Sequence, residues 1–378
     1  MNKKRFITIF DRTKNFHLVK DVGQIPYHLH KEFGYESEII TCKNDENYSY
    51  LDKEVKGLKL TFIPNIKLFK INLGVVLYLI KNAKKIDVLH QFHIRNYTLF
   101  YAFVYKLFNK KGTTYIKADA NEKNLLDRGY IVKNKYINRI KSNIDIISFE
   151  TSEIVNTFKK ENPDLPVKVI HIPNGVDERY ITEELKMSNN ICSKKENSIV
   201  YVARIGTHQK NTELFLNSIK NVDISNWKVH LIGEIDPSFN TFIESFFEEN
   251  KNLKDKVMFH GNISSRREIY EYYSKSKIFC MSSRYEGFPL VYPEVVYFGN
   301  YIFTTDVSGA KDITDNEKYG TIVKSFSAED YSKKLSEILE KYNIDESFCD
   351  EIKGFAKENF TWQKIIKNLD KNIGYLND

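Results

Sequence analysis

The sequence has few residues of the kind that cross-link a chain or chelate a metal. Its 378 residues include only four cysteines, at positions 42, 192, 280 and 349, and none of them forms a Cys-x-x-Cys motif. We therefore expect neither a disulfide framework nor a zinc site. This cysteine usage is typical of a protein in a reducing, cytoplasmic compartment.

Long hydrophobic runs and nucleic-acid motifs are also missing. No apolar run approaches the roughly 18–20 residues that span a bilayer, and Leu73–Ile80 is among the longest. The segment Met1–Ile7 is basic, but its apolar run is short, which predicts a first β-strand rather than a signal peptide. Because no nucleic-acid-binding motif is recognisable, we expect no nucleic-acid partner.

What the sequence does contain is typical of a globular protein. Hydrophobic residues make up 42% of the chain and aromatic residues 14%. A chain of 378 residues favours two domains, each of them large enough to bury a core of its own.

Charge is unevenly distributed along the chain. Residues 1–180 contain 31 Lys and Arg against 20 Asp and Glu, whereas residues 181–378 contain 26 against 30. The basic first half indicates contact with an anionic surface, and anionic lipid or a lipid-phosphate acceptor fits better than nucleic acid. The alternative is a lysine-rich chain whose surface charges have no such role.

Strand and helix patterns alternate along the chain. In the first half, the runs that predict strands are Arg5–Phe10, Glu38–Thr41, Leu60–Ile63, Val88–His90, Thr114–Ala118, Ile144–Glu150 and Lys168–Ile172. After a polar stretch the pattern restarts with Ser198–Ala203, Lys228–Ile232, Lys256–His260, Lys277–Met281 and Tyr301–Thr304. Alternating βα units predict parallel, doubly wound sheets that bind ligands at the carboxyl ends of their strands.

The most informative motif runs from Glu286 to Glu294. It follows the apolar run Ile278–Met281 and leads into a helix that we expect Gly299 to end. This layout places Glu286 in a strand-to-helix loop, the N–H groups of residues 288–291 at a helix N-terminus, and Glu294 in the first turns of the helix. Such groups bind hydroxyls and phosphate oxygens, so the motif predicts a polyol-phosphate site. The alternative is a pair of solvated acids that flank a helix.

This stretch resembles the signature of the family 4 glycosyltransferases, which are retaining enzymes that use nucleotide sugars. The shared features are two Glu separated by seven residues and the sequence Gly-Phe-x-Leu-Val after the first Glu. The resemblance implies the GT-B architecture, an α/β fold of two doubly wound Rossmann-like domains that face a cleft. We expect an acceptor-side domain over residues 1–180, a donor-binding domain over residues 181–360, and a C-terminal helix at about 361–378 that crosses back to the first domain.

The resemblance also assigns roles in the second domain. Glu286 would contact the hydroxyls of the donor sugar, and Glu294 would bind the ribose. The backbone between them would bind hydroxyls and phosphate, through Gly287, Phe288, Pro289, Leu290 and Val291. Pro293 departs from the family pattern, but proline is tolerated in the first turn of a helix.

Two cations match the family's clamp on the nucleotide diphosphate. Arg204 ends a predicted strand, and Lys210 opens the next helix. A leaving diphosphate gains negative charge as the glycosidic bond breaks, so fixed cations stabilise the transition state more than the ground state. The alternative is that both residues are ordinary surface charges. The loop that carries Gly261 and Ile263 resembles the one whose backbone faces the nucleobase, and the Pro-Asn-Gly-Val-Asp turn at 173–177 resembles the family's domain-ending turn.

The first domain matches the family less well. In place of a Gly-Gly loop it has only Gly23, near which Lys20 would help to bind the diphosphate. Two histidines compete for the position of the family's active-site His, and we favour His93 because His90 falls inside a hydrophobic strand. Lys117 and Asp119, at the end of another strand, are secondary candidates.

These features predict a retaining hexosyltransferase of capsule or exopolysaccharide assembly, at the inner face of the membrane. It would move a sugar from a nucleotide diphosphate, for which family frequency favours UDP, to a glycan or a lipid-linked acceptor. Because the sequence contains no Asp-x-Asp, we expect neither a metal nor a cofactor. Two alternatives remain open, namely a nucleotide-sugar 2-epimerase of the same architecture and a non-catalytic partner subunit.

Overall fold

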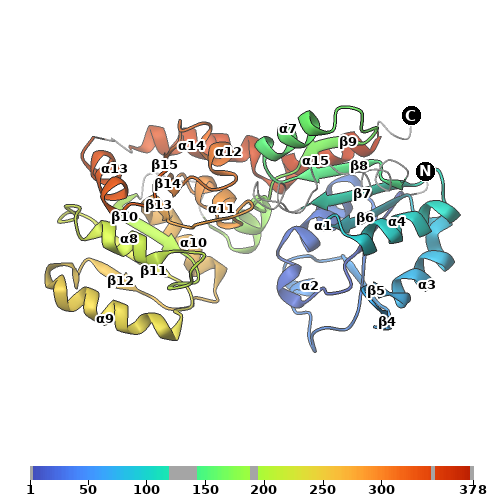
Figure 1. The fold of residues 1–378 in the computed structure, drawn as a ribbon, viewed down its shortest axis with the longest axis horizontal. Coiled ribbons are helices and arrows are strands. Elements are labelled where there is room, and N and C mark those ends of the chain that lie inside the picture. Colours follow the sequence, from blue (N-terminus) through green and yellow to red (C-terminus); the bar gives the residue numbers. More distant parts are fainter. Residues whose placement is uncertain (1–2, 119–142, 188–194, 342–344, 375–378) are drawn as a thin grey trace. The chain divides into compact units, whose positions relative to one another are not determined.

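The computed structural model describes residues 3–118, 143–187, 195–341 and 345–374. The chain divides into two compact units (Figure 1). The first comprises Met1–Asp177 and Trp362–Asp378, and the second comprises Glu178–Thr361.

A seven-stranded parallel sheet forms the centre of the first unit. Its strand order is β3-β2-β1-β6-β7-β8-β9, which is doubly wound because the chain runs outward from β1 in one direction and from β6 in the other. The strands are β1 (Arg5–Ile9), β2 (Glu36–Thr41), β3 (Lys59–Phe62), β6 (Val88–Phe92), β7 (Thr113–Ala118), β8 (Ile146–Phe149) and β9 (Lys168–His171). All residues of β6, β7 and β8 are buried, as expected for a parallel sheet that is covered on both faces.

Helices cover both faces of this sheet. The helices are α1 (Asp21–Phe33), α2 (Tyr50–Lys53), α3 (Leu73–Asn82), α4 (Asn96–Phe108), α7 (Ser152–Glu161) and α15 (Trp362–Gly374). One core cluster joins α1 and α15 to the sheet through Phe6, Ile25, Trp362 and Ile366. Another joins α3 and α4 to the opposite face through Ile7, Leu79, Leu89 and Tyr105. The expected C-terminal helix therefore belongs to the core of the first unit.

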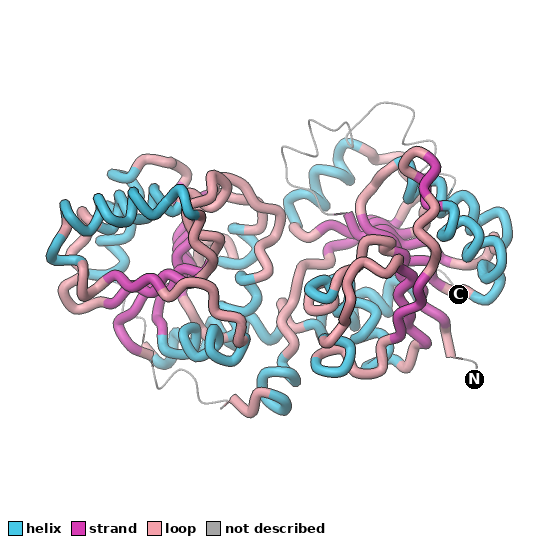
Figure 2. Tube along the Cα trace, turned by 90° about the horizontal axis from the view of Figure 1, so that it is seen from below, coloured by secondary structure: helices cyan, strands magenta, loops and turns pink. Residues whose placement is uncertain are grey.

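The second unit contains a six-stranded parallel sheet in the order β12-β11-β10-β13-β14-β15. Its strands are β10 (Glu196–Val202), β11 (Lys228–Ile232), β12 (Val257–Phe259), β13 (Ser276–Met281), β14 (Tyr301–Thr305) and β15 (Gly320–Val323). Its helices are α8 (Thr212–Ile219), α9 (Asn240–Glu249), α10 (Arg266–Lys275), α11 (Val291–Tyr297), α12 (Ala310–Thr314), α13 (Ala328–Lys341) and α14 (Glu346–Asn359). Figure 2 shows the strands of each unit as a twisted layer with helices around it.

The predicted fold class, two doubly wound Rossmann-like units with a terminal helix in the first, is confirmed. Three short strands were not predicted. These are β15 and the antiparallel hairpin of β4 (Lys67–Leu68) and β5 (Ile71–Asn72). The cysteines depart from expectation at one position, because Cys349 is disulfide-bonded, whereas Cys42 and Cys280 are buried free thiols.

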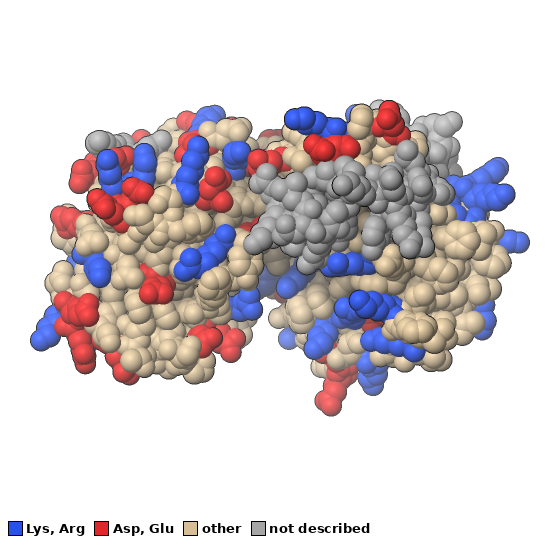
Figure 3. Space-filling model, viewed as in Figure 1, with Lys and Arg blue, Asp and Glu red and all other residues tan. Residues whose placement is uncertain are grey.

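Exposed large apolar side chains of the first unit gather on α3, α4 and the β4–β5 hairpin. Phe69, at the tip of the hairpin, is 94% exposed, and α4 carries an outward stripe of Phe100, Phe103 and Leu107 at helical spacing. On α3, Leu77 and Ile80 also point outward. Figure 3 shows Lys and Arg side chains on the visible face of the same unit. None of the helices in the described ranges has the length and apolarity that crossing a membrane requires.

Candidate functional site

The strand order of the second unit brings two predicted site segments together. Strands β10 and β13 are neighbours, and the direction of winding reverses between them. Ligands of doubly wound sheets bind at the carboxyl ends of the two strands at such a switch point. The segment after β10 carries Arg204 and Lys210, and the segment after β13 carries Glu286.

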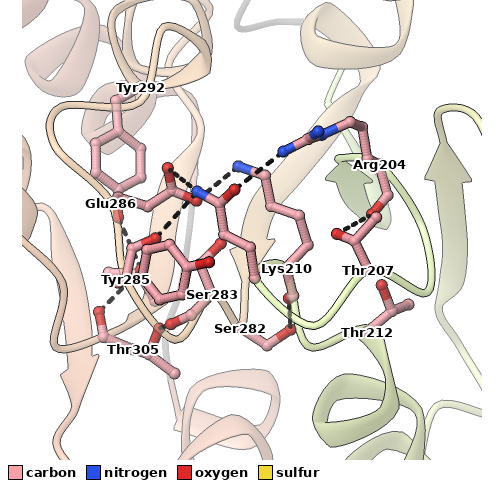
Figure 4. A network of polar contacts seen from close by, with 12 residues as sticks. Arg204, Thr207, Lys210, Thr212, Ser282, Ser283, Tyr285, Glu286, Tyr292 and Thr305 are labelled. Carbon is pink, nitrogen blue, oxygen red and sulfur yellow. Dashed lines mark hydrogen bonds and ion pairs between the residues drawn. The ribbon is translucent and has the colours of Figure 1, made fainter.

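Lys210 and Glu286 form an ion pair at this edge of the sheet. The distance from Lys210 Nζ to Glu286 Oε1 is 2.6 Å, and both side chains are largely buried. The amide of Gln209 donates to the other carboxylate oxygen of Glu286 at 3.3 Å. Burying a charge is costly unless it is paired and hydrogen-bonded, so each member of this pair requires the other. Figure 4 shows Lys210 and Glu286 pointing toward each other from the two loops.

Arg204 lies at the exposed margin of the same network. Its guanidinium donates to Gln209 Oε1 at 3.0 Å, and its carbonyl oxygen accepts from Thr207 Oγ1 at 3.0 Å (Figure 4). Gln209 therefore links Arg204 to Glu286. The arrangement presents two cations and a carboxylate side by side, with the Arg204 guanidinium in contact with solvent.

The loop that carries Lys210 is fixed by buried hydroxyls. Tyr201 Oη donates to the Lys210 carbonyl oxygen at 2.9 Å, and Ser282 Oγ donates to the Asn211 carbonyl oxygen at 2.9 Å. Asn211 adopts a left-handed conformation (φ 51°) just before α8, and its side chain accepts from Arg284 at 2.8 Å. These bonds fix the backbone of the loop and therefore the point from which the Lys210 side chain extends.

Helix α11 begins where the sequence predicted. Val291 is its first residue, Glu294 lies in its first turn despite Pro293, and Gly299 follows the helix with φ 71°. One detail of the prediction is wrong, because Pro289 has no N–H and cannot donate to a ligand. Phe288 is buried and packs on Phe360, with ring centroids 5.8 Å apart, so its side chain is structural.

Glu294 has partners from α10 that the sequence did not reveal. Tyr270 Oη donates to Glu294 Oε1 at 3.0 Å, and a guanidinium nitrogen of Arg266 lies 3.7 Å from the same oxygen. The side chains of Arg266 and Glu294 are about a quarter exposed, at 24% and 23%. Neither Arg266 nor Tyr270 belongs to a recognisable motif, so no sequence signal marks them.

The Gly261–Ile263 loop follows β12 at the carboxyl edge of the sheet. Gly261 adopts φ 67°, and its carbonyl oxygen accepts from Gly233 N at 2.8 Å. Gly233 must itself be glycine, because a Cβ at that position would lie 1.7 Å from the Ala203 carbonyl oxygen. The carboxyl ends of β11 and β12 are thereby held close to the loop after β10, which carries Arg204.

In the first unit, Lys117 is the centre of a buried polar cluster. Its ammonium lies 2.6 Å from Glu150 Oε1, 2.8 Å from Asp21 Oδ2 and 3.2 Å from Asn174 Oδ1. Burial opposes ionisation of Asp21, but the Lys117 ammonium, His93 and the N–H of Val22 together outweigh burial and lower the pKa of this carboxyl. The other secondary candidate, Asp119, lies outside the described residues.

Lys20 and Gly23 lie at the start of α1. The Lys20 ammonium lies over the Phe16 ring, 4.7 Å from its centroid. The N–H of Gly23 donates to the Lys20 carbonyl oxygen at 3.0 Å, and a Cβ at Gly23 would lie 2.1 Å from the Leu18 carbonyl oxygen. This close packing accounts for the glycine without any ligand.

The two histidine candidates have different surroundings. His90 is fully buried in β6, with its ring stacked on Tyr115 and Nδ1 3.1 Å from Thr8 Oγ1. Burial lowers the pKa of His90 to about 3, so this ring is neutral. His93 lies just beyond β6 with φ 61°, a conformation that costs energy for a residue other than glycine and that clusters at functional sites. Burial also lowers the pKa of His93.

Comparison with known proteins supports the resemblance. Residues 183–359 match the family model described as Glycosyl transferases group 1. An uncharacterized 41.2 kDa protein in the cps region of Klebsiella pneumoniae is 25% identical over 342 residues, which cover 88% of this chain and 86% of that protein. The recognition of a group 1, family 4-like glycosyltransferase pattern is confirmed. The positions of Arg204, Lys210, Glu286 and Glu294 lie within the matched range.

Two further proteins are similar to this chain, one in sequence and one in structure. A Campylobacter jejuni α-1,4-N-acetyl-D-galactosaminyltransferase that acts on a diphospho-undecaprenol-linked glycan is 28% identical over 183 residues, 47% of each chain. An Anabaena protein solved in complex with UDP and glucose superposes with a TM-score of 0.68 at 12% identity, over 98% of this chain and 99% of that chain. The second likeness is one of fold.

Proposed function

We propose that this chain is a retaining glycosyltransferase of surface-glycan assembly that uses a UDP-sugar. The observation that carries the proposal is the network of Arg204, Gln209, Lys210 and Glu286 at the switch point of the second sheet. A diphosphate and a polyol are the ligands that two cations beside a carboxylate suit best. The family match over residues 183–359 supports the same class of reaction.

In this mechanism the second unit holds the donor. Arg204 and Lys210 bind the diphosphate and stabilise the charge that it gains as the glycosidic bond breaks. Glu286 accepts hydrogen bonds from the sugar hydroxyls while it holds Lys210, 2.6 Å away, in place. Glu294 binds the ribose hydroxyls. In this proposal Arg204 and Lys210 balance the charge of the leaving diphosphate, and neither a metal nor a cofactor is needed.

The acceptor is a hydroxyl of a glycan or a lipid-linked sugar, held by the first unit near His93. Retention follows when the acceptor hydroxyl attacks on the face from which the diphosphate departs, and a phosphate oxygen accepts the hydroxyl proton. The Campylobacter relative, which acts on a diphospho-undecaprenol-linked glycan, supports a lipid-linked acceptor. The UDP in the Anabaena structure supports the choice of nucleotide.

One incubation experiment tests the class of reaction. The purified protein is mixed with a panel of UDP-, GDP- and dTDP-sugars, with and without diphospho-polyprenol-linked acceptors, and the products are identified by mass spectrometry and NMR. A retaining transferase forms a glycoside that keeps the anomeric configuration of the donor, whereas a product of opposite configuration would contradict retention. An epimerase releases an altered nucleotide sugar without any acceptor, and a non-catalytic partner returns every donor unchanged. Either of these last two outcomes would contradict the proposal.

The two carboxylates are expected to act on different parts of the donor. Glu294→Gln should weaken the binding of free UDP by about 10-fold to 100-fold, the scale of losing hydrogen bonds to a charged group, and equally for every sugar on that nucleotide. Glu286→Gln should instead reduce transfer and change the preference among sugars. Isothermal titration with UDP and with several UDP-sugars measures both effects.

Glu271→Gln is the matched control for these two variants. Glu271 lies on the exposed side of α10, paired with Arg267 at 3.3 Å. Its replacement should leave UDP binding unchanged. UDP that binds Glu294→Gln as tightly as the wild type would remove Glu294 from the ribose site.

We also propose that the enzyme works in the cytoplasm, bound to the inner face of an anionic membrane. The apolar surface of the β4–β5 hairpin, α3 and α4 supports this, because aromatic and aliphatic side chains that enter an interface bind more strongly beside basic residues. Lys81, Lys84 and Lys85 are exposed at the end of α3 and directly after it.

Removing these charges should weaken binding to vesicles. Each basic residue near an anionic surface contributes roughly 1 kcal/mol, so the triple change of Lys81, Lys84 and Lys85 to Gln should lower affinity by about 100-fold at low salt. Sedimentation with vesicles that contain phosphatidylglycerol measures the loss, and added salt should weaken the binding that remains.

A second triple variant, with Gln at Lys220, Lys251 and Lys254 of the second unit, removes the same charge from exposed positions and should bind normally. Phe69→Ser should reduce binding without changing the charge. A wild-type protein that ignores anionic vesicles at low salt would contradict the membrane proposal.

A further inference from the structure

The first unit has a small cavity at its own switch point. Strands β1 and β6 are neighbours from which the chain winds in opposite directions, and their carboxyl ends form one wall of the cavity. The cavity measures about 70 Å³, and its polar lining residues include Asp11, Arg12, Gln91 and His93. A single water needs about 10–15 Å³ of such space, so the cavity has room for a few heavy atoms but not for a complete pyranose ring.

Gln91 is the unexplained residue of this cavity. Its side chain is fully buried, yet neither Oε1 nor Nε2 has a hydrogen-bond partner among the described residues. Leaving a buried polar atom unsatisfied costs about 1–3 kcal/mol, and the amide has two such atoms. An apolar residue of the same size would avoid this cost. A buried glutamine with an unpartnered amide that lines a cavity is therefore suited to a ligand.

Other polar groups of the cavity have hydrogen-bond or ion-pair partners within the protein. Tyr101 Oη accepts from Asn72 N at 2.7 Å, and Thr98 Oγ1 donates to the His93 carbonyl oxygen at 2.9 Å. Asp11 Oδ1 lies 3.9 Å from Arg12 Nε, so the negative and positive charges of this pair largely cancel. The remaining lining is aromatic and aliphatic, from Ile9, Phe10, Phe92 and Tyr97. This environment favours an uncharged group with polar and apolar edges over a phosphate or a carboxylate.

We infer that the cavity receives two neighbouring hydroxyl groups of the acceptor sugar, which hydrogen-bond to the carboxamide of Gln91. A carboxamide has one acceptor and one donor side by side. Of two adjacent hydroxyls, one donates to Oε1 while the other accepts from Nε2, and the ring carbons that bear them lie against the aromatic wall. A single hydroxyl group can hydrogen-bond to Oε1 or to Nε2 of Gln91, but it leaves the other atom without a partner. The assignment of this sugar as the acceptor rests on the proposed function.

The position of the cavity agrees with this role. His93, the favoured active-site histidine, lines the same cavity and carries the strained backbone. A sugar whose hydroxyl pair is held by Gln91 has its remaining hydroxyls outside the cavity, where one of them is free to react. Gln91 then determines which acceptor sugars bind, because a sugar with the wrong pair of hydroxyls leaves the amide unsatisfied.

Saturation-transfer NMR with methyl hexopyranosides of the gluco, galacto and manno series tests the inference on the complete chain. The wild type should bind at least one of these glycosides, and Gln91→Leu should weaken that binding by about 10-fold, the loss expected for two neutral hydrogen bonds. Monodeoxy derivatives that lack either hydroxyl of the pair should bind the wild type as weakly as the parent glycoside binds Gln91→Leu. Binding of UDP, which the second unit provides, should be the same in both proteins.

Gln24→Leu is the control for burial of a glutamine. Gln24 is also buried in the first unit, but its amide is paired with the Leu18 carbonyl oxygen at 3.2 Å and with His28 at 3.2 Å. Its replacement should lower the melting temperature and leave glycoside binding intact. Gln91→Leu should leave the melting temperature unchanged or raise it, and Gln91→Met provides a second apolar variant of similar volume.

Two results would overturn the inference. The first is that no methyl glycoside binds the wild type, in which case the cavity holds only water. The second is that a glycoside binds Gln91→Leu as tightly as it binds the wild type. The proposed function is judged separately on the same samples. If UDP binds and a sugar is transferred while glycoside binding is insensitive to Gln91, only this inference fails. If UDP does not bind at all, the proposed function fails, and the glycoside result still decides the role of Gln91.

Discussion

Lys210→Ala is expected to reduce sugar transfer by about 10²-fold or more, the scale of losing one preorganised group that stabilises transition-state charge. The same substitution removes the partner of Glu286, 2.6 Å away, so the carboxylate that contacts the sugar also loses its fixed position. Arg204→Ala should cost about as much in turnover, but it should disturb the loop less because Arg204 is exposed. Steady-state kinetics with saturating donor measures both losses.

Controls separate chemistry from folding. Lys220, directly after α8, is exposed, and Lys220→Ala removes the same charge far from the switch point. It should leave turnover unchanged. Lys210→Ala leaves the buried Glu286 carboxylate without its cation and should lower the melting temperature, whereas Arg204→Ala should not. Circular dichroism at the assay temperature should show that both variants remain folded. Turnover close to the wild-type value in either folded variant would exclude that residue from the mechanism.

The second large effect is expected on stability. Lys117→Met should lower the free energy of unfolding of the first unit by about 3–5 kcal/mol, because it leaves the carboxylates of Asp21 and Glu150 buried without their cation. Denaturant unfolding followed by far-UV circular dichroism measures the change. Lys106→Met is the matched control, because Lys106 pairs with Asp145 at 2.7 Å in the same unit but the Asp145 side chain is 31% exposed and stays hydrated without its partner. It should cost about 1 kcal/mol or less.

A triple variant keeps this prediction testable if Lys117→Met does not fold. Combining Lys117→Met with Asp21→Asn and Glu150→Gln removes the uncompensated charges and should recover much of the stability. A triple variant no more stable than Lys117→Met would show that the loss does not come from buried charge.

The same cluster predicts the response to acid. Because the pKa of Asp21 is lower in the folded protein than in the unfolded chain, its contribution to stability is complete above the ordinary aspartate value of about 3.9. That contribution is lost as the pH falls below this value and through the lowered pKa. Replacing Lys117 should flatten this part of the dependence of stability on pH.

The sequence was sufficient to predict most of the fold. Buried parallel strands are continuous apolar runs, so all twelve predicted strands overlap observed ones, whereas β15 was missed because its four residues begin with a glycine. The β4–β5 hairpin was missed for a similar reason, since strands of two residues carry no periodicity. Where boundaries differ, they differ by one or two residues, because polar residues continue a strand or end it early.

The donor-side residues could be proposed because they lie in motifs that resemble a family. Lys210 and Glu286 are 76 positions apart, and only the adjacency of β10 and β13 brings them into contact. Residues outside motifs could not be found in this way. Gln91 and Lys117 sit in apolar strands, where the sequence shows a polar residue but not whether its partners are protein atoms or a ligand. Arg266 and Tyr270 are ordinary helix residues until α10 lies beside α11.

Helix α15 has a consequence for the order in which the chain folds during synthesis. Its residues Trp362, Ile366 and Ile373 complete the core that Phe6 and Ile25 begin, and the N–H of Trp362 bonds to the Val176 carbonyl oxygen. The 184 residues of Glu178–Thr361 are translated between these two halves. At about 5–20 residues per second, the ribosome needs roughly 10–40 s for that segment. Throughout this interval the face of the first sheet that α15 covers is still exposed, and the second unit has its whole sequence before α15 has been made. We therefore expect the nascent first unit to be the part that chaperones bind.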